Sequence, residues 1–167
     1  MGVLFEPIID EDSQLLILGT YPGKESLRLQ QYYADRRNKF WEIIFGTFGS
    51  IPSDNYNAKV SFLKRKGIAI WDVYQFVERK SSLDKDTKYR VPNDFEALLR
   101  TYPNLKYAAF NGRSPYDGFV QCVPKATRDL LTGIGSPLQS SSGANAKSVP
   151  VKIEDWKRLL LYLGEVR

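Results

Sequence analysis

The sequence predicts an α/β fold, built on a parallel sheet that is covered by helices on both faces. Three short apolar runs, at residues 15–18, 68–73 and 107–110, have the length and composition of strands buried on both faces. Amphipathic helical segments separate these runs, and such an alternation is typical of parallel sheets. Because ligands bind beyond the carboxyl ends of such strands, we expect a binding site in the turns that follow them.

The chain length and composition indicate one globular domain, spanning residues 1–167. Of its residues 43% are apolar and 26% are charged, and no linker or internal repeat divides the sequence. The 24 Lys and Arg residues outnumber the 19 Asp and Glu residues, which leaves a net charge of +5. A basic surface favours polyanions such as nucleic acid, although many basic proteins bind none.

Two residue types limit the chemistry that the chain can perform. The sequence has a single cysteine, Cys122, and no histidine. This composition excludes a disulfide within the chain, a zinc site of the Cys/His kind, and a Ser or Cys nucleophile activated by histidine. The sequence shows no secretory signal pattern and no apolar run of membrane-spanning length, so we expect a cytoplasmic protein without membrane contact.

The first half of the chain gives clear element boundaries. The first strand ends at Gly19, and residues 26–33 form a short helix or an ordered loop. A second helix begins near Asn38 or Lys39 and ends at the Gly and Pro residues of 49–53. The apolar periodicity of residues 57–66 predicts a third helix, with Gly67 as its stop signal before the strand at 68–73.

The second half continues the alternation. Residues 75–89 are polar and charged, which indicates a surface loop, and Pro92 and Asp94 begin a helix that extends to residue 102. A strand at 107–110 and a short helix at 115–122 follow. We expect a fourth strand within residues 130–138, a small-residue loop at 139–145 and a final amphipathic helix at 152–164.

Individually, the polar motifs have ordinary explanations. Residues 19–23 (Gly-Thr-Tyr-Pro-Gly) fit a plain strand-to-helix turn, and they lack the spacing of phosphate loops and dinucleotide-binding fingerprints. Asn38 fits a helix N-cap, and the serines of residues 140–145 fit either a flexible linker or phosphate contacts.

In combination and in this order, the motifs resemble those of the hypoxanthine (deoxyinosine) DNA glycosylases, a branch of the uracil-DNA glycosylase superfamily. The resemblance covers about residues 13–163, and its blocks are residues 19–23, 32–33 with 38–41, 67–72, 82–84, 91–95, 110–112 and 138–146. It implies a three-layer α/β/α sandwich with a central four-stranded parallel sheet. It also implies a monofunctional enzyme, without metal or cofactor, that hydrolyses the N-glycosidic bond of a damaged base in DNA.

The resemblance also implies which residues act. Positions that elsewhere in the superfamily carry an activating Asp or Asn and a His are held here by Tyr21 and Leu138, and this branch is thought to use Asn38 instead. The amide of Asn38 could orient a water through its carbonyl oxygen and donate elsewhere through its NH₂ group. The last motif usually has two prolines where this sequence has Gln139 and Gly143, and from their loss we expect a more mobile loop.

These arguments lead to one set of site residues. The expected base-binding residues are Gly19, Thr20, Tyr21, Pro22, Gly23, Phe40, Asp72 and Asn111, although Phe40 fits the core equally well. The expected DNA-binding residues are Gly112, Arg113, Ser140, Ser141, Ser142, Asn145 and Lys147. The expected enzyme is a monomer that acts on hypoxanthine, or on uracil, in DNA. The alternative is a non-catalytic module on the same fold that binds nucleic acid or nucleotides.

Overall fold

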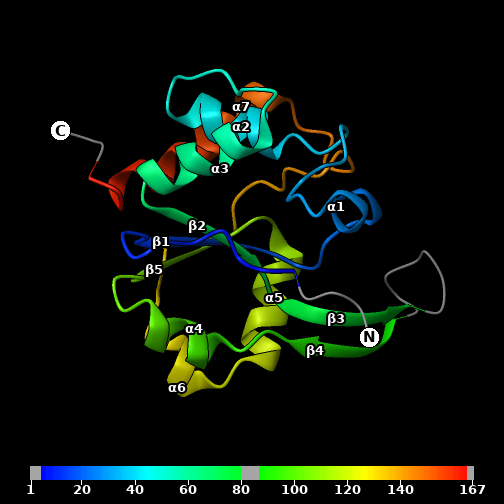
Figure 1. Ribbon diagram of the computed structural model, residues 1–167, viewed down its shortest axis with the longest axis vertical. Helices are drawn as coiled ribbons and strands as arrows, with labels where there is room; N and C mark the ends of the chain where they lie inside the picture. Colours follow the sequence, from blue (N-terminus) through cyan, green and yellow to red (C-terminus); the bar gives the residue numbers. More distant parts are fainter. Residues whose placement is uncertain (1–4, 80–86, 165–167) are drawn as a thin grey trace.

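A four-stranded parallel sheet forms the centre of the molecule (Figure 1). The computed structural model describes residues 5–79 and 87–164. The strand order is β2-β1-β5-β6, and the strands are β1 (Leu15–Gly19), β2 (Ile68–Asp72), β5 (Tyr107–Phe110) and β6 (Thr132–Gly133). Strand β1 is buried along its whole length, as its apolar sequence predicts.

The register of the sheet brings Gly19, Asp72 and Asn111 to one edge. Gly19 lies opposite Asp72 in the pairing of β1 with β2, and Leu18 lies opposite Phe110 in the pairing of β1 with β5. Asn111 directly follows Phe110, and its N–H donates to the Leu18 carbonyl over 2.9 Å. Because the strands are parallel, their carboxyl ends deliver these residues to the same edge.

Helices cover both faces of the sheet, which confirms the three-layer α/β/α arrangement (Figure 1). One face packs against α2 (Phe40–Thr47), α3 (Tyr56–Arg65), α7 (Val149–Trp156) and the 3₁₀ helix that follows, Lys157–Leu161. The other face packs against α4 (Phe95–Thr101) and α5 (Arg113–Cys122), and α6 (Lys125–Arg128) lies on the same side. Alternate residues of β1 contribute to the two cores, since successive strand residues point to opposite faces.

The prediction of a surface loop at residues 75–89 is wrong. Strands β3 (Tyr74–Arg79) and β4 (Thr87–Pro92) form an antiparallel hairpin outside the central sheet. A two-stranded ribbon with large exposed areas needs few apolar residues, so its sequence lacks the alternation that identifies half-buried strands. The Ser82–Asp84 block of the resemblance lies outside the described residues.

Several boundaries differ from the expected ones for local reasons. Helix α1 (Lys24–Leu29) begins earlier than predicted and is shorter. Helix α4 begins at Phe95, because the Asp94 carboxylate accepts from the Ala97 N–H over 3.0 Å and caps the helix. The last helix begins at Val149 rather than residue 152 and tightens into a 3₁₀ helix after Trp156. Among the described residues, no helix is long and apolar enough to cross a membrane.

Candidate active site

Two cavities lie at the carboxyl edge of the sheet and form one continuous site. The larger has a volume of about 1150 Å³ and the smaller about 470 Å³. They share the lining residues Tyr21, Tyr33, Asn38, Asp72 and Ser142. Segments that are far apart in the sequence, from residue 19 to residue 152, therefore meet around a single cleft.

The structure brings together all but one of the residues expected at the site. Those that line one or both cavities are Gly19, Thr20, Tyr21, Pro22, Gly23, Asn38, Asp72, Asn111, Gly112, Arg113, Ser140, Ser141, Ser142, Asn145 and Lys147. The exception is Phe40, which lines neither cavity and is fully buried. Its ring stacks on Tyr33 at a centroid distance of 4.0 Å, so Phe40 supports the site from the core side.

Tyr33 is the aromatic residue that takes the expected place of Phe40 in the cavity wall. It lines both cavities, and its hydroxyl accepts a hydrogen bond from Asn111 Nδ2 over 3.2 Å. Its φ of +53° is a left-handed conformation that bulky residues rarely adopt. Neighbouring contacts hold this turn, because the Tyr32 carbonyl accepts from Trp41 Nε1 over 3.0 Å. The sequence signal was the Tyr32-Tyr33 pair, to which no role was assigned.

Asp72 is a buried carboxyl group at the centre of the site. It is 6% exposed and lines both cavities, and its side-chain oxygens have no hydrogen-bond partner in the described part of the chain. Burial raises the pKa of Asp72 to about 7. A Cβ added at Gly19 would lie 2.5 Å from Asp72 Oδ1 and 3.0 Å from the Tyr33 hydroxyl, so a side chain at this position would displace the Asp72 carboxyl group. The carboxyl group therefore belongs to the cleft rather than to a structural ion pair.

A chain of short hydrogen bonds connects Asn111 to Asn38 through Ser141. Asn111 Oδ1 accepts from the Ser141 N–H over 2.8 Å, and Asn111 Nδ2 donates to Ser141 Oγ over 2.8 Å. Ser141 Oγ in turn donates to Asn38 Oδ1 over 2.7 Å. A second donor, the Phe40 N–H, reaches the same Asn38 oxygen over 3.0 Å.

Two backbone groups determine the direction of every bond in this chain. An N–H can only donate, so the Ser141 N–H identifies Oδ1 of Asn111 and the Phe40 N–H identifies Oδ1 of Asn38. Asn111 Nδ2 must then donate to the Ser141 hydroxyl, and this hydroxyl donates its own hydrogen bond to Asn38 Oδ1. Two donors already reach the Asn38 carbonyl oxygen, which leaves the NH₂ group as the part of this amide without a bond in the chain. The expectation that Asn38 orients a water stays a prediction.

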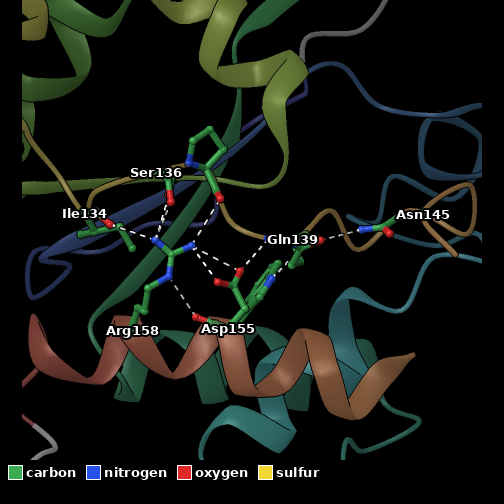
Figure 2. A network of polar contacts seen from close by, with 8 residues as sticks. Ile134, Ser136, Gln139, Asn145, Asp155 and Arg158 are labelled. Carbon is green, nitrogen blue, oxygen red and sulfur yellow. Dashed lines mark hydrogen bonds and ion pairs between the residues drawn. The ribbon is translucent and has the colours of Figure 1, made fainter. Parts of the chain in front are cut away.

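The loop at residues 139–145 is tethered to α7 (Figure 2). The Gln139 N–H donates to the Asp155 carboxylate over 2.7 Å, and Trp156 Nε1 donates to the Gln139 carbonyl over 2.8 Å. Arg158 holds Asp155 in turn, with 3.0 Å between Arg158 Nη2 and Asp155 Oδ1. A proline at position 139 would have no N–H to donate, so Gln139 adds a tether where the expected ring constraint is missing.

Lys152 and Gly143 complete the attachment of this loop. Lys152 is 2% exposed, and its Nζ donates to the carbonyls of Ser142 and Asn145 over 3.2 Å and 3.1 Å. A Cβ added at Gly143 would lie 2.9 Å from the Arg37 carbonyl oxygen, so glycine permits close approach to the segment that carries Asn38. These contacts oppose the loop mobility expected from the two missing prolines.

The polar groups of the cleft are amides, hydroxyls, basic side chains, the buried carboxyl group of Asp72 and the carboxylate of Asp35, which pairs with Arg37. Among the described residues, no group of three or more His, Cys, Asp or Glu side chains is placed to hold a metal ion. Such a set can hydrogen-bond a heterocyclic base and contact phosphates.

Comparison with known proteins places this chain in a family. Residues 6–160 match the model of the Uracil DNA glycosylase superfamily. A hypoxanthine DNA glycosylase of Methanosarcina barkeri is 36% identical over 155 residues, which cover 91% of this chain and 93% of the relative. A hypoxanthine DNA glycosylase of Methanosarcina acetivorans is 34% identical over 157 residues, covering 92% and 94%.

A solved structure agrees with the sequence matches. The solution NMR structure of a candidate uracil DNA glycosylase from Methanosarcina acetivorans superimposes with a TM-score of 0.80, at 30% identity and 98% coverage of both chains. The fold and the family match extend over almost the whole chain, as the motif resemblance predicts. This chain belongs to the uracil DNA glycosylase superfamily.

Proposed function

We propose that this protein is a monofunctional DNA glycosylase, which hydrolyses the N-glycosidic bond of hypoxanthine in DNA and accepts uracil as a second substrate. The observation that carries the proposal is the cleft, in which Asn38, Asp72 and Asn111 meet at the edge of the sheet. The two relatives named as hypoxanthine DNA glycosylases support hypoxanthine as the first substrate.

The reaction requires the base to leave its duplex stack and enter the cleft. The bond between the sugar C1′ and the base nitrogen then breaks, and its electron pair departs with the base. The sugar becomes an oxocarbenium-like cation, to which the oxygen of a water adds. The water loses one proton, and the leaving base gains one, so the products are the free base and an abasic sugar with a hydroxyl at C1′.

In this mechanism Asn38 positions the attacking water. Its NH₂ group donates to the water oxygen, which keeps a lone pair available for C1′. The two donors on Asn38 Oδ1 prevent the amide from rotating, so the water is held in one orientation. Asn38 does not need to remove a proton, because an oxocarbenium ion accepts a neutral water readily. Its contribution is orientation, which requires no titratable group.

Asp72 acts on the other side of the bond, where negative charge develops on the leaving base. Its raised pKa, caused by burial, leaves a large part of the carboxyl groups protonated near neutral pH. A neutral carboxyl group donates one hydrogen bond and accepts another, which matches the adjacent N–H and C=O of hypoxanthine and of uracil. The donated bond strengthens as the base becomes negative, and this difference stabilises the transition state.

Release of the base from defined DNA tests the proposal. Single-turnover reactions on duplexes with one hypoxanthine or one uracil should give free base and an abasic site that breaks in alkali. A duplex with only normal bases is the control. Binding that prefers the lesion, without alkali-labile sites, would contradict the enzymatic function and favour a non-catalytic nucleic-acid-binding module.

A further inference from the structure

The β3–β4 hairpin is a second wall of the cleft that the sequence did not predict. It begins two residues after Asp72. Backbone hydrogen bonds attach its first residues to the end of β1. The N–H groups of Val73 and Tyr74 donate to the carbonyls of Gly19 and Thr20 over 2.8 Å and 3.1 Å. Figure 1 shows the hairpin extending beyond the sheet on the side of α1. Its base is therefore fixed relative to the catalytic residues.

The buried side chain of Tyr74 anchors the start of β3 against α5. Tyr74 is 1% exposed, and a Cβ added at Gly118 of α5 would lie 2.6 Å from its hydroxyl oxygen. Such close packing leaves little freedom at the start of β3. A side chain carried by this part of the hairpin is thus held at a defined distance from the cleft.

The two faces of the hairpin differ in character. Val77 pairs with Arg90, and both residues line the smaller cavity. Phe76 and Tyr89 belong to the other face, since each is adjacent in sequence to one member of that pair. We call the Val77–Arg90 face the inner face. It is continuous with the site, because the same cavity is lined by Ser140 and Arg113 from other elements.

Arg90 is an exposed cation on this inner face. Its guanidinium carbon lies 5.3 Å from the centroid of the Tyr74 ring. Within residues 5–79 and 87–164, no carboxylate forms an ion pair with it, whereas Arg113 across the cavity pairs with Asp117 over 2.8 Å. The Arg90 side chain also hydrogen-bonds the Tyr74 side chain. A guanidinium has five N–H donors, so further donors remain for the oxygens of a phosphate.

We propose that the inner face of the β3–β4 hairpin binds the DNA strand that carries the damaged base, with Arg90 contacting a backbone phosphate. This inference rests on the proposed function and adds a second protein contact to the strand. The loop at residues 139–145 holds the strand on one side of the flipped nucleotide, and the hairpin holds it on the other. Two separated phosphate contacts would keep the sugar aligned with Asn38 while the base is extruded.

Salt dependence of binding tests the contact directly. Each phosphate contact that is lost reduces the slope of log K against log salt by about 0.9. We expect Arg90→Ala to reduce the slope by about 1, and to weaken binding of a duplex with non-hydrolysable 2′-fluoro-deoxyinosine about tenfold at low salt. Arg90→Lys should keep the slope. Arg100→Ala removes the same charge from an exposed position on α4 outside both cavities, and its slope should equal that of the wild type.

Two results would overturn the inference. One is a slope for Arg90→Ala that equals that of Arg100→Ala, which would mean that Arg90 contacts no phosphate. The other is an equal reduction of the slope in Arg90→Lys, which would show that the positive charge at position 90 does not account for the salt dependence. Base release by the wild type is measured separately. Its absence would contradict the proposed function, whereas the comparison of slopes concerns Arg90 alone.

Discussion

The hydroxyl of Ser141 donates a hydrogen bond to Oδ1 of Asn38 over 2.7 Å, across 103 positions of the sequence. Ser141 is buried but lines the smaller cavity, and Asn38 lines both cavities, so the bond joins two segments of the cavity wall. The backbone carbonyl of Ser141 also accepts a hydrogen bond from the Lys39 N–H over 3.0 Å. Two contacts therefore attach the last loop to the segment that carries the proposed catalytic residue.

Ser141→Ala should slow base release because it removes one of the two donors that orient Asn38. We expect the single-turnover rate to fall by about 10- to 100-fold, in the range that misplacement of a reacting group produces. The protein should remain folded, since the deletion is small. Ser61→Ala removes the same hydroxyl from an exposed position on α3 and should react at the wild-type rate. Equal rates for both variants would contradict a positioning role.

Substitutions at Asn38 distinguish the contribution of its NH₂ group from that of its carbonyl oxygen. Asn38→Ala should reduce the single-turnover rate by a factor on the order of 10² to 10³, with binding of the lesion largely retained. Asn38→Asp keeps an oxygen for the Ser141 and Phe40 donors but lacks the NH₂ group, and it should be about as slow. An active Asn38→Asp variant would show that the acceptor, rather than the donor, performs the reaction step.

The rate of base release should depend on pH through Asp72. The carboxyl group has a pKa of about 7, raised by burial, so it is neutral below this pH and ionised above it. The ionised form repels the negative charge that develops on the base, and we expect the single-turnover rate to fall as pH rises above 7. In Asp72→Asn the amide cannot ionise, and this fall should disappear.

A rate that increases with pH, the opposite profile, would assign Asp72 a different role in the reaction. The side chains nearest to it in the cleft include the Tyr33 hydroxyl, whose pKa is raised by burial, so that Tyr33 stays protonated over the tested range. A rate that rises through pH 7 would therefore mean that Asp72 accepts a proton from the attacking water. Identical pH profiles of the rate for wild type and Asp72→Asn would show that Asp72 is not the group whose ionisation changes the rate.

Lys152→Met should loosen the loop at residues 139–145. The variant keeps most of the side-chain volume but leaves the carbonyls of Ser142 and Asn145 without their donor. We expect the free energy of unfolding to fall by about 1–3 kcal/mol, and amide hydrogen exchange in the loop to become faster. Lys157→Met changes an exposed ion pair with Glu154 and should alter neither quantity appreciably. Unchanged exchange in the loop would mean that Asp155 and Trp156 suffice to hold it.

The sequence alone determined the fold class, the family and a set of site residues, of which all but Phe40 line the cleft. Buried parallel strands such as 15–19 are uniformly apolar, and the turns after them carry the polar groups, so local composition identifies both. Sequence reasoning failed at the hairpin, because residues in a largely exposed ribbon show no clear apolar alternation. It also left open whether Phe40 faces the core or the cavity, since an aromatic residue close to Asn38 in the sequence can do either, and the structure buries it in the core.

Only the tertiary structure decided which atoms the site presents. The sequence could name Asn38, Ser141 and Asn111 separately, but the direction of their hydrogen bonds depends on backbone N–H groups brought together by folding. The same is true of Asp72, whose raised pKa results from burial under segments distant in the sequence. Residue types specify which chemistry is available, whereas donor direction and desolvation are properties of the assembled cleft.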